Sequence, residues 1–283
     1  MQYKEVAGGI CAPKGFAAAG VHCGIRANHS EKYDLALIKA EVRCAAAGVY
    51  TTNKVCGAPI KVDRAHLADG YAQAIVVNSG NANTCAANGV ALAEECCALV
   101  GKALNMDEKD VLPASTGVIG QPMVIDPFAR GIPAAAEKLA ATAQGSTDAA
   151  TAIMTTDTHK KEYAIQFELG GKVCTVGAIG KGSGMIAPNM ATMLAVMLTD
   201  ADVDRETWQA MFARAVDKTF NRVSVDGDTS TNDTILGLAN GASGIRAEGE
   251  DAALLEKGLT DILGQISYML VKDGEGASKV MHI

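Results

Sequence analysis

The stretch that decides the architecture is EYAIQFELGGKVCTVGAIGKGSGMIAPNMATMLAVMLT, residues 162–199. Segments 162–169 and 172–179 alternate around Gly170-Gly171, a pattern that predicts a β-hairpin with a two-residue glycine turn. The second strand leads into a polar loop that contains Lys181, and the apolar run 193–199 predicts a further short strand. A polar turn and Thr192 therefore stand directly in front of a predicted strand.

The rest of the chain alternates short strands with grouped helices. Strands are predicted at 36–43 and 74–78, the second running straight into the polar segment SGNANTCAANG at 79–89. Helical spacing, with Asp126 and Asp204 as starting residues of two helices, predicts helices over 91–104, 127–144, the segment after Asp204 and 250–271. Strands in hairpins and adjacent runs favour an α+β layered architecture over a doubly wound parallel sheet.

Composition narrows the class of partner. The chain has 283 residues, of which 48% are hydrophobic and 20% charged, as expected for a globular protein of one large domain or two coupled ones. The net charge of -7 offers no basic stripe for nucleic acid, so a small molecule is the expected ligand. No apolar run has the length of a signal-peptide core or membrane span, so we expect a cytoplasmic protein without membrane contact.

Two types of metal signature are missing from the sequence. The eight cysteines include no CxxC pair, and the five histidines form no HExxH motif or pair at i, i+4. We therefore predict no metal site and interpret most cysteines as reduced core residues.

The loop around Lys181 does not match the common phosphate or serine motifs. A P-loop requires Ser or Thr after its lysine, whereas Gly182 follows Lys181, and Met185 replaces the third glycine of a dinucleotide fingerprint. Ser183 lacks the GxSxG context of a hydrolase elbow. The later stretch DGDTSTNDT, 226–234, lacks the glycine and glutamate of a calcium loop.

The chemistry of the residues allows two interpretations of Thr192, one catalytic and one structural. An N-to-O acyl shift at Ala191-Thr192, followed by hydrolysis, would free an α-amino group, which titrates near about 7.7–8.0 and is suited to act as a base. Alternatively, Thr192 opens a β-strand, where threonine is common. The residues alone favour the strand, because a single threonine is weak evidence for catalysis.

Seven longer motifs follow one another along the chain: GVYTTN at 48–53, VVNSGNANTCAANG at 76–89, PASTGVIG at 113–120, IMTTDT at 153–158, KGSGMIAPNMATML at 181–194, FNRVSVDGDTSTNDT at 220–234 and VKDGEGASK at 271–279. In this order they resemble the ArgJ family, the ornithine acetyltransferase (glutamate N-acetyltransferase) of arginine biosynthesis. The resemblance implies a layered α/β/β/α sandwich of the DmpA/ArgJ-like type with an autoprocessed N-terminal-threonine nucleophile. With this resemblance, the interpretation of Thr192 as a nucleophile is favoured over its interpretation as a strand residue.

The resemblance also implies a reaction. The precursor would cleave between Ala191 and Thr192, giving an α-chain segment 1–191 and a β-chain segment 192–283 that assemble as an α2β2 heterotetramer. Thr192 would accept the acetyl group of N2-acetylornithine and pass it to glutamate in a ping-pong reaction. No cofactor is implied, although some family members also accept acetyl-CoA as a co-substrate.

Five residues besides the cleavage pair match functional positions of the family. Thr116 and Gly117 match an oxyanion pair, while Thr155, Lys181 and Glu275 match substrate-binding positions. Without the resemblance, Thr116-Gly117 fits a cap or turn equally well, Lys181 a solvated loop lysine, and Glu275 an exposed loop residue. We interpret Asn78, Asn81 and Asn83 as scaffold, and Asp226, Asp228 and Asn232 as residues that brace the site.

One departure keeps other functions open. Members of the family continue past the segment ending here at Ile283, and the resemblance implies that this further part supplies an asparagine and a threonine to the substrate pocket. The alternatives are an amidohydrolase or aminopeptidase that uses the same threonine but transfers the acyl group to water, and an inactive relative that only binds amino acids.

Overall fold

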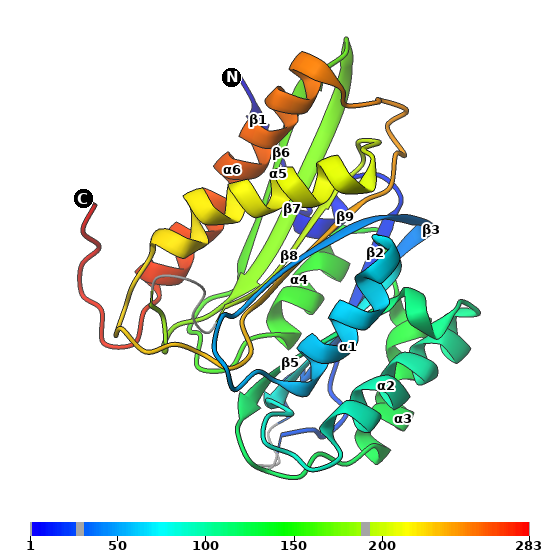
Figure 1. Ribbon diagram of the computed structural model, residues 1–283, viewed down its shortest axis with the longest axis vertical. Helices are drawn as coiled ribbons and strands as arrows, with labels where there is room; N and C mark the ends of the chain where they lie inside the picture. Colours follow the sequence, from blue (N-terminus) through cyan, green and yellow to red (C-terminus); the bar gives the residue numbers. More distant parts are fainter. Residues whose placement is uncertain (1, 27–30, 188–192, 283) are drawn as a thin grey trace.

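The computed structural model describes residues 2–26, 31–187 and 193–282 (Figure 1). Its strands are β1 Lys4–Glu5, β2 Phe16–Val21, β3 Leu35–Tyr50, β4 Tyr71–Asn81, β5 Val111–Val118, β6 Lys161–Leu169, β7 Lys172–Lys181, β8 Leu194–Thr199 and β9 Thr234–Ala239. Its α-helices are α1 Ala58–His66, α2 Gly89–Leu104, α3 Asp126–Lys138, α4 Ala143–Ala152, α5 Arg205–Lys218 and α6 Gly249–Lys272.

All the strands belong to one mixed sheet. Its order is β1-β6-β7-β8-β9-β3-β4-β5, and β2 pairs with the first part of β3. The pairs β4–β5 and β8–β9 are parallel, and the others are antiparallel. The long strand β3 joins the two halves, because its first part pairs with β2 and its last part with β9.

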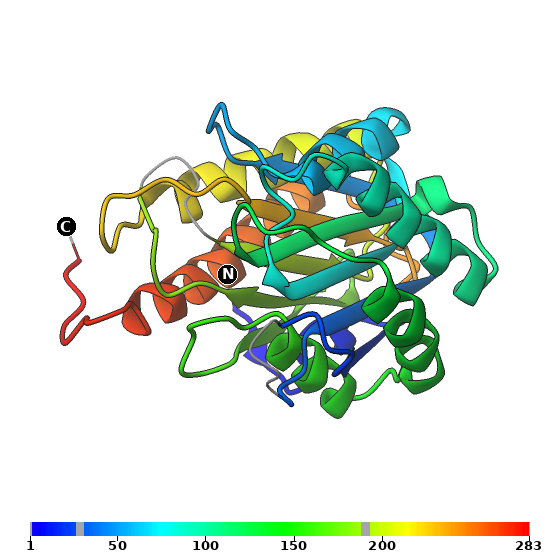
Figure 2. The same ribbon diagram turned by 90° about the horizontal axis from the view of Figure 1, so that it is seen from below.

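Alternation along the strands divides the core into layers. On β3, Ala36 and Ile38 belong to an inner cluster with residues of β4, β5, β7, β8, β9 and α4. The neighbouring Leu35 and Leu37 face outward, against α1, α2 and α3. Helices α5 and α6 cover the outer face of the β6–β9 half, and Figure 2 shows the strands flanked by helices on both sides. The prediction of a layered α+β fold is confirmed. Its two β layers, one around β6–β9 and the other around β2–β5, are the two halves of one hydrogen-bonded sheet.

Helix α5 shows how local sequence and packing agree. The Asp204 carboxylate accepts the Thr207 N–H at 2.9 Å, so it caps the helix as predicted. Trp208, Phe212 and Val216 are all buried on one face, and burial of each contributes about 1.5–3 kcal/mol. The Trp208 indole N–H also donates to the Gly237 carbonyl at 3.1 Å, which ties α5 to β9.

The prediction of one helix over 127–144 is wrong, because two helices occupy this region. Helix α3 ends at Lys138, and Ala140 exchanges two backbone hydrogen bonds with Ala18 of β2, of 3.1 and 3.2 Å. Helix α4 then starts with Thr142 as its cap, whose hydroxyl accepts the Gly145 N–H. A distant strand thus captures the backbone at the break, which helical spacing alone does not reveal. The sequence patterns also do not predict strands β1, β2, β5 and β9 or helix α1.

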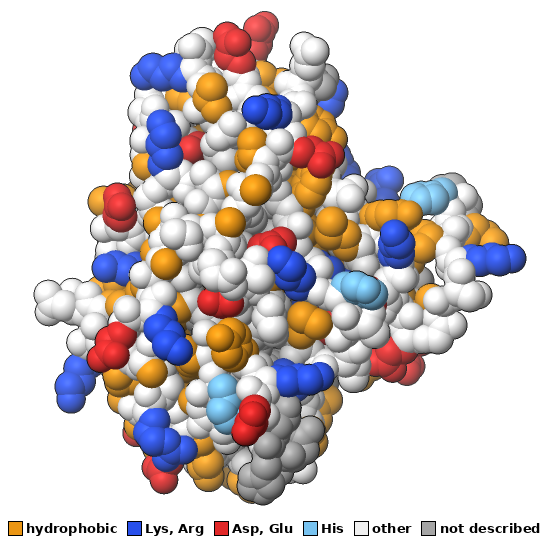
Figure 3. Space-filling view, turned by 180° about the vertical axis from the view of Figure 1, so that it is seen from behind, with side chains coloured by type: hydrophobic (Ala, Val, Ile, Leu, Met, Phe, Trp, Pro, Cys, Tyr) orange, Lys and Arg blue, Asp and Glu red, His pale blue; other side chains and the backbone are white. Residues whose placement is uncertain are grey.

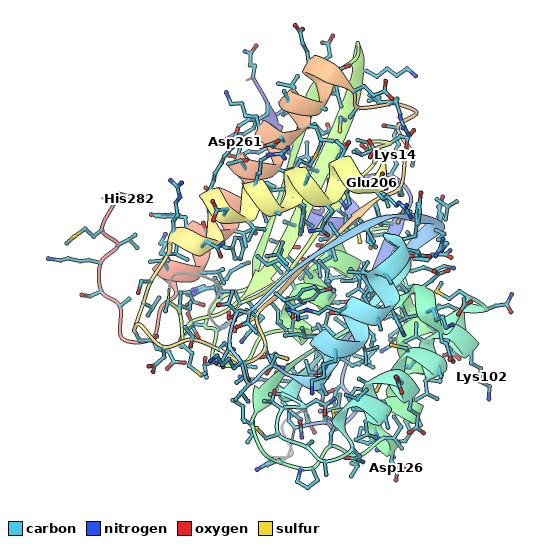
Figure 4. The ribbon with its side chains drawn as sticks, viewed as in Figure 1. Lys14, Lys102, Asp126, Glu206, Asp261 and His282 are labelled. Carbon is cyan, nitrogen blue, oxygen red and sulfur yellow. The ribbon has the colours of Figure 1, made fainter. Side chains whose placement is uncertain are left out.

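Charged groups cover the outside of the fold without collecting by sign on the face in Figure 3, where basic and acidic side chains are interspersed. Lys102, Asp126 and Glu206 lie exposed on the outer helices (Figure 4). In the described part of the chain, none of the helices combines the length and apolar character that a membrane crossing requires.

Asp63 of α1 is a buried exception that makes stability depend on pH. Its side chain is fully buried, and neither carboxylate oxygen has a hydrogen-bond partner among the described residues. Burial raises the pKa of this carboxyl well above its usual range. The folded protein therefore keeps a proton that the unfolded chain loses near pH 4, so this group makes folding less favourable as the pH rises from there.

We expect Asp63→Asn to remove this pH dependence while keeping the shape of the side chain. Urea unfolding at pH 4, 6 and 8 should show a variant close to wild type at pH 4 and more stable at pH 8, by more than about 1.4 kcal/mol, the equivalent of one pKa unit. Asp126→Asn, at an exposed position, is the control. Equal pH slopes for wild type and Asp63→Asn would show that this carboxyl is ionised in the folded protein.

Candidate active site

The ends of neighbouring strands bring distant motifs together. Lys181, the last residue of β7, pairs with Leu194 of β8, and Leu194 pairs with Thr234 of β9. From the other half of the sheet, Thr116 near the end of β5 accepts a hydrogen bond from the Lys181 ammonium group at 3.3 Å. The motifs PASTGVIG and KGSGMIAPNMATML, 65 positions apart at this contact, therefore meet at one point.

Lys181 is buried, with 2% of its surface exposed. Burial lowers the pKa of its ammonium group, the carboxylates of Asp157 and Asp233 oppose that shift, and the charges of Lys161 and Arg26 add to it. The interpretation of Lys181 as a solvated loop lysine is therefore wrong. A cation enclosed beside the Thr116 hydroxyl is suited to attract an anionic group.

Gly117 packs against the adjacent strand so closely that only glycine fits. Its φ is +132°, and a Cβ at this position would lie 2.3 Å from the carbonyl carbon of Gly80, its neighbour across β4 and β5. The Thr116-Gly117 pair thus ends a strand. It is neither a helix cap nor an isolated turn, the two structural alternatives that the sequence allowed.

Asp157 joins three parts of the site, although sequence reasoning did not select it. Its carboxylate accepts the backbone N–H groups of Thr155 at 3.0 Å and Gly182 at 2.7 Å. The same carboxylate accepts the Lys161 ammonium at 2.6 Å, and that ammonium also pairs with Asp273 at 2.6 Å. Thr155 is therefore held beside the Lys181 loop through its backbone.

The charges of this network balance one another. Burial raises the pKa of Asp157, but the nearby Lys181 and Lys161 outweigh it and leave the pKa below its usual value. The pKa of Asp273 is likewise lowered, because hydrogen bonds from Lys161 and Thr158 outweigh its burial. The sequence signals for these residues were the position of Asp157 two residues after Thr155 in IMTTDT and that of Asp273 two residues before Glu275 in VKDGEGASK.

Glu275 lies on the outer side of this network. Its backbone N–H donates to the Ser183 carbonyl at 2.6 Å, and the Ser183 hydroxyl contacts the Thr156 hydroxyl at 2.6 Å. A cavity of about 640 Å³ is lined by Glu275, Thr156, Lys161 and Asp273 among others, whereas Thr116 and Lys181 do not line it. Of the predicted residues, Thr116 and Lys181 are therefore buried and Thr155 is half-buried, whereas Gly117 and Glu275 are exposed.

The proposed cleavage pair, Ala191 and Thr192, lies outside the described residues. Met193, the next residue, is described: its N–H donates to the Asp233 carboxylate at 2.8 Å. The Asp233 side chain is fully buried at the start of β9. Asp233 was not among the residues selected from sequence, although its motif was.

The residues interpreted as scaffold make the contacts expected of that role. Asn78 accepts the Ser115 hydroxyl, and Asn232 donates to the carbonyls of Ala82 and Ser115 at 2.6 and 3.0 Å. The Asn81 side chain likewise accepts the Asn83 N–H. The NSGNAN and TSTND segments therefore hold the end of β5 between them.

Asp226 holds the other loop, since its carboxylate accepts the N–H groups of Met185 and Ile186. Asp228 is exposed and donates its backbone N–H to Asp226. In the described ranges, no three or more His, Cys, Asp or Glu side chains are grouped so as to hold a metal ion.

Comparison with known proteins identifies the family behind this geometry. The profile of the ArgJ family matches residues 17–283. The chain belongs to the ArgJ family. The arginine biosynthesis bifunctional protein ArgJ of Nitratidesulfovibrio vulgaris is 50% identical over 275 residues, covering 96% of this chain and 68% of that relative. The glutamate N-acetyltransferase of Methanocaldococcus jannaschii is 44% identical over 283 residues, covering 99% of this chain and 68% of the relative.

Solved structures agree with the ArgJ assignment. A crystal structure of ArgJ from Bacillus halodurans has a TM-score of 0.63 and 39% identity over 67% of this chain and 98% of its own. Ornithine acetyltransferase of Mycobacterium tuberculosis, solved with ornithine, has a TM-score of 0.61 and 34% identity over 66% of this chain and 98% of its own. An aminopeptidase from Ochrobactrum anthropi, described as a variant of the Ntn hydrolase fold, has a TM-score of 0.55 with 11% identity over 97% of this chain and 89% of its own, and shares the fold alone.

The buried ion pairs of Lys161 lead to a stability prediction for this ArgJ chain. Lys161→Met would leave Asp157 and Asp273 without their shared cation, so we expect a loss of about 3–5 kcal/mol in the free energy of unfolding. Lys160→Met is the matched control, because the neighbouring lysine is exposed and its surface pair with Glu162 contributes about 0–1 kcal/mol. Urea unfolding of both variants measures the difference. Equal losses would contradict a structural role for the buried network.

Proposed function

We propose that this ArgJ-family chain is an acetyltransferase that moves the acetyl group of N2-acetylornithine to glutamate through Thr192. The observation that carries the proposal is the buried Lys181 ammonium group, which is hydrogen-bonded to Thr116 beside Gly117. The backbone of Lys181 pairs with Leu194, the first residue of β8, which stands two residues after Thr192 in the sequence. The printed names of the similar proteins, a bifunctional arginine biosynthesis protein, a glutamate N-acetyltransferase and an ornithine acetyltransferase bound to ornithine, support the same substrates.

Self-cleavage would prepare the nucleophile. The Thr192 hydroxyl attacks the Ala191 carbonyl, the peptide C–N bond breaks as the amine leaves with a proton, and an ester forms between the two segments. Water then hydrolyses this ester, which releases the Ala191 carboxylate and restores the hydroxyl. The new α-amino group of Thr192 titrates near neutral pH and acts as the base in the later steps.

Acetyl transfer would follow in two halves. The Thr192 oxygen attacks the acetyl carbonyl of N2-acetylornithine, its proton passes through the α-amino group to the departing ornithine nitrogen, and an acetyl-threonine ester remains. The amino group of glutamate then attacks this ester and returns the proton to the threonine oxygen. Each half builds a negative oxygen that the Thr116 hydroxyl and the Gly117 N–H would stabilise. Because the Thr116 oxygen accepts a hydrogen bond from the Lys181 ammonium group, its own O–H is available as a donor.

The remaining residues would hold the substrate. An ammonium group has three donors, so Lys181 can bond Thr116 and still pair with the substrate α-carboxylate. Thr155, fixed through Asp157, offers a hydroxyl nearby, and the exposed Glu275 carboxylate suits the amino end of ornithine. The proposal requires no cofactor. It includes acetyl-CoA as a second acetyl donor and an α2β2 heterotetramer, both carried over from the family resemblance.

We expect Thr192→Ala to prevent both cleavage and acetyl transfer, because the hydroxyl is needed for each. Intact-mass spectrometry of denatured wild-type protein should give two fragments, with an acetyl mass on the C-terminal fragment after incubation with N2-acetylornithine. The variant should give a single mass. A cleaved Thr192→Ala protein would overturn the mechanism, and ornithine release indifferent to glutamate would indicate an amidohydrolase.

We expect Thr116→Val, which removes the hydroxyl but keeps the shape, to lower kcat by about 10²–10³-fold with little change in KM. The reason is that an oxyanion donor acts mainly in the transition state. Steady-state kinetics of ornithine release on processed enzyme measures the effect, with Thr52→Val, at an exposed position, as the control. A change confined to KM would assign Thr116 to substrate binding.

A further inference from the structure

Asp233 is a buried acidic side chain that the proposed reaction does not use. It stands immediately before β9, and its side chain has no exposed surface. One oxygen, Oδ1, accepts the Met193 N–H at 2.8 Å. The other oxygen, Oδ2, is buried without a hydrogen-bond partner among the described residues. Leaving such an atom unpaired costs free energy, so the arrangement calls for an explanation beyond packing.

Neighbouring polar side chains in the same region are better satisfied. Asn232, the preceding residue, donates to two carbonyls and accepts the hydroxyls of Thr84 and Thr231. The contrast separates two roles within one short segment. Asn232 fixes the backbone of the site, whereas Asp233 Oδ2 has no hydrogen-bond partner of normal geometry among the described residues, although the Ser230 and Thr51 side chains lie close enough to lower the pKa of the carboxyl.

The position of Asp233 links it to the proposed nucleophile and to the buried cation. The Met193 nitrogen that it binds is covalently joined to the carbonyl carbon of Thr192, so the carboxyl acts on the peptide bond directly after that residue. The register of β7, β8 and β9 sets Lys181 beside Leu194 and Leu194 beside Thr234. The charge of Lys181 also acts on Asp233 through space.

The Asp233 carboxyl changes its protonation state near neutral pH. Burial raises its pKa to about 7, against the lowering effects of the Met193 N–H, Lys181, Ser230 and Thr51. Lys181 on β7 is the charged group acting on it, and Lys181 in turn faces Asp157, Lys161 and Arg26. A carboxylate accepts an N–H bond more strongly than a carboxylic acid does. The hold on the Met193 peptide therefore strengthens as the pH rises through neutrality.

We propose that Asp233 is a positioning residue for self-cleavage, which in its ionised form fixes the peptide that follows Thr192. The inference rests on the proposed function, because it assumes cleavage at Ala191-Thr192. It adds a residue and a pH control that the proposed reaction does not require. Small displacements of reacting groups cost large factors in rate, so a loosened peptide should slow the acyl shift.

The first test follows cleavage of freshly prepared precursor by intact mass between pH 5.5 and 8.5. The wild-type rate should fall as the pH drops through about 7, because the carboxylate gains a proton. The α-amino group cannot cause this change, since it does not exist before cleavage. Asp233→Asn keeps the shape and an oxygen acceptor for Met193, and it should cleave about 10- to 100-fold more slowly with a flat pH profile.

Two controls separate this effect from misfolding. Asp126→Asn makes the same chemical change at an exposed position of α3, away from the site, and should behave as wild type. Thermal unfolding of Asp233→Asn should match wild type within a few degrees, because its shape is kept. Asp233→Ala, which loses the acceptor, should cleave more slowly than Asp233→Asn.

A second readout does not depend on cleavage. In Thr192→Ala protein labelled with 15N-methionine, which should stay uncleaved and so has no α-amino group beside Met193, the Met193 amide signal should titrate with a midpoint near 7. It should not titrate when Asp233→Asn is added to the same background. A wild-type rate and pH profile in Asp233→Asn, or a Met193 amide indifferent to pH, would overturn the inference and leave the role of Thr192 intact. A cleaved Thr192→Ala protein would instead overturn the proposed function, and a wild-type chain that is never cleaved would overturn both.

Discussion

Lys181 carries a positive charge into the interior at the end of β7, where burial disfavours that charge, and the surrounding structure compensates for it. The carboxylates of Asp157 and Asp233 act on this charge, and the Thr116 hydroxyl accepts a hydrogen bond from the ammonium group. These three partners come from three separate motifs. A buried cation is unstable without such partners, so the position of Lys181 depends on the contacts among the ends of β5, β7 and β9 that form the site.

A second buried cation extends the same network outward. Lys161, the first residue of β6, bridges Asp157 in the segment before β6 and Asp273 at the end of α6 through two ion pairs. Asp157 in turn accepts the Gly182 N–H, which connects the loop after β7 to the same network. Glu275 follows two residues after Asp273, and its backbone is bonded to Ser183. The position of the exposed acidic residue thus depends on the same charges that fix the buried end of the site.

The sheet explains how a chain cut after residue 191 can stay together. Strand β8 lies between β7 and β9 and pairs with both, so the α and β segments share one set of backbone hydrogen bonds. Met197 of β8 and Val176 of β7 also belong to one core cluster with α5 and α6. The proposed boundary passes through the middle of the sheet and does not separate two folding units, so cleavage would leave most contacts between the segments in place.

The sequence by itself determined the hairpin 161–181, the strand after the loop, the Asp204 cap of α5 and the extent of α6, because each depends on local periodicity or turn chemistry. It also determined the family, since seven motifs recur in one order. Only the tertiary structure decided that α3 and α4 are separate, because a distant strand captures Ala140, and that Lys181 is buried. It alone revealed Asp157, Lys161 and Asp233 as partners of the site. Lys181 acts on Asp157 and on Asp233, and Lys161 pairs with Asp273, each across more than 20 residues of sequence, because the fold brings these charges together in a low-dielectric interior. No local pattern records such a meeting.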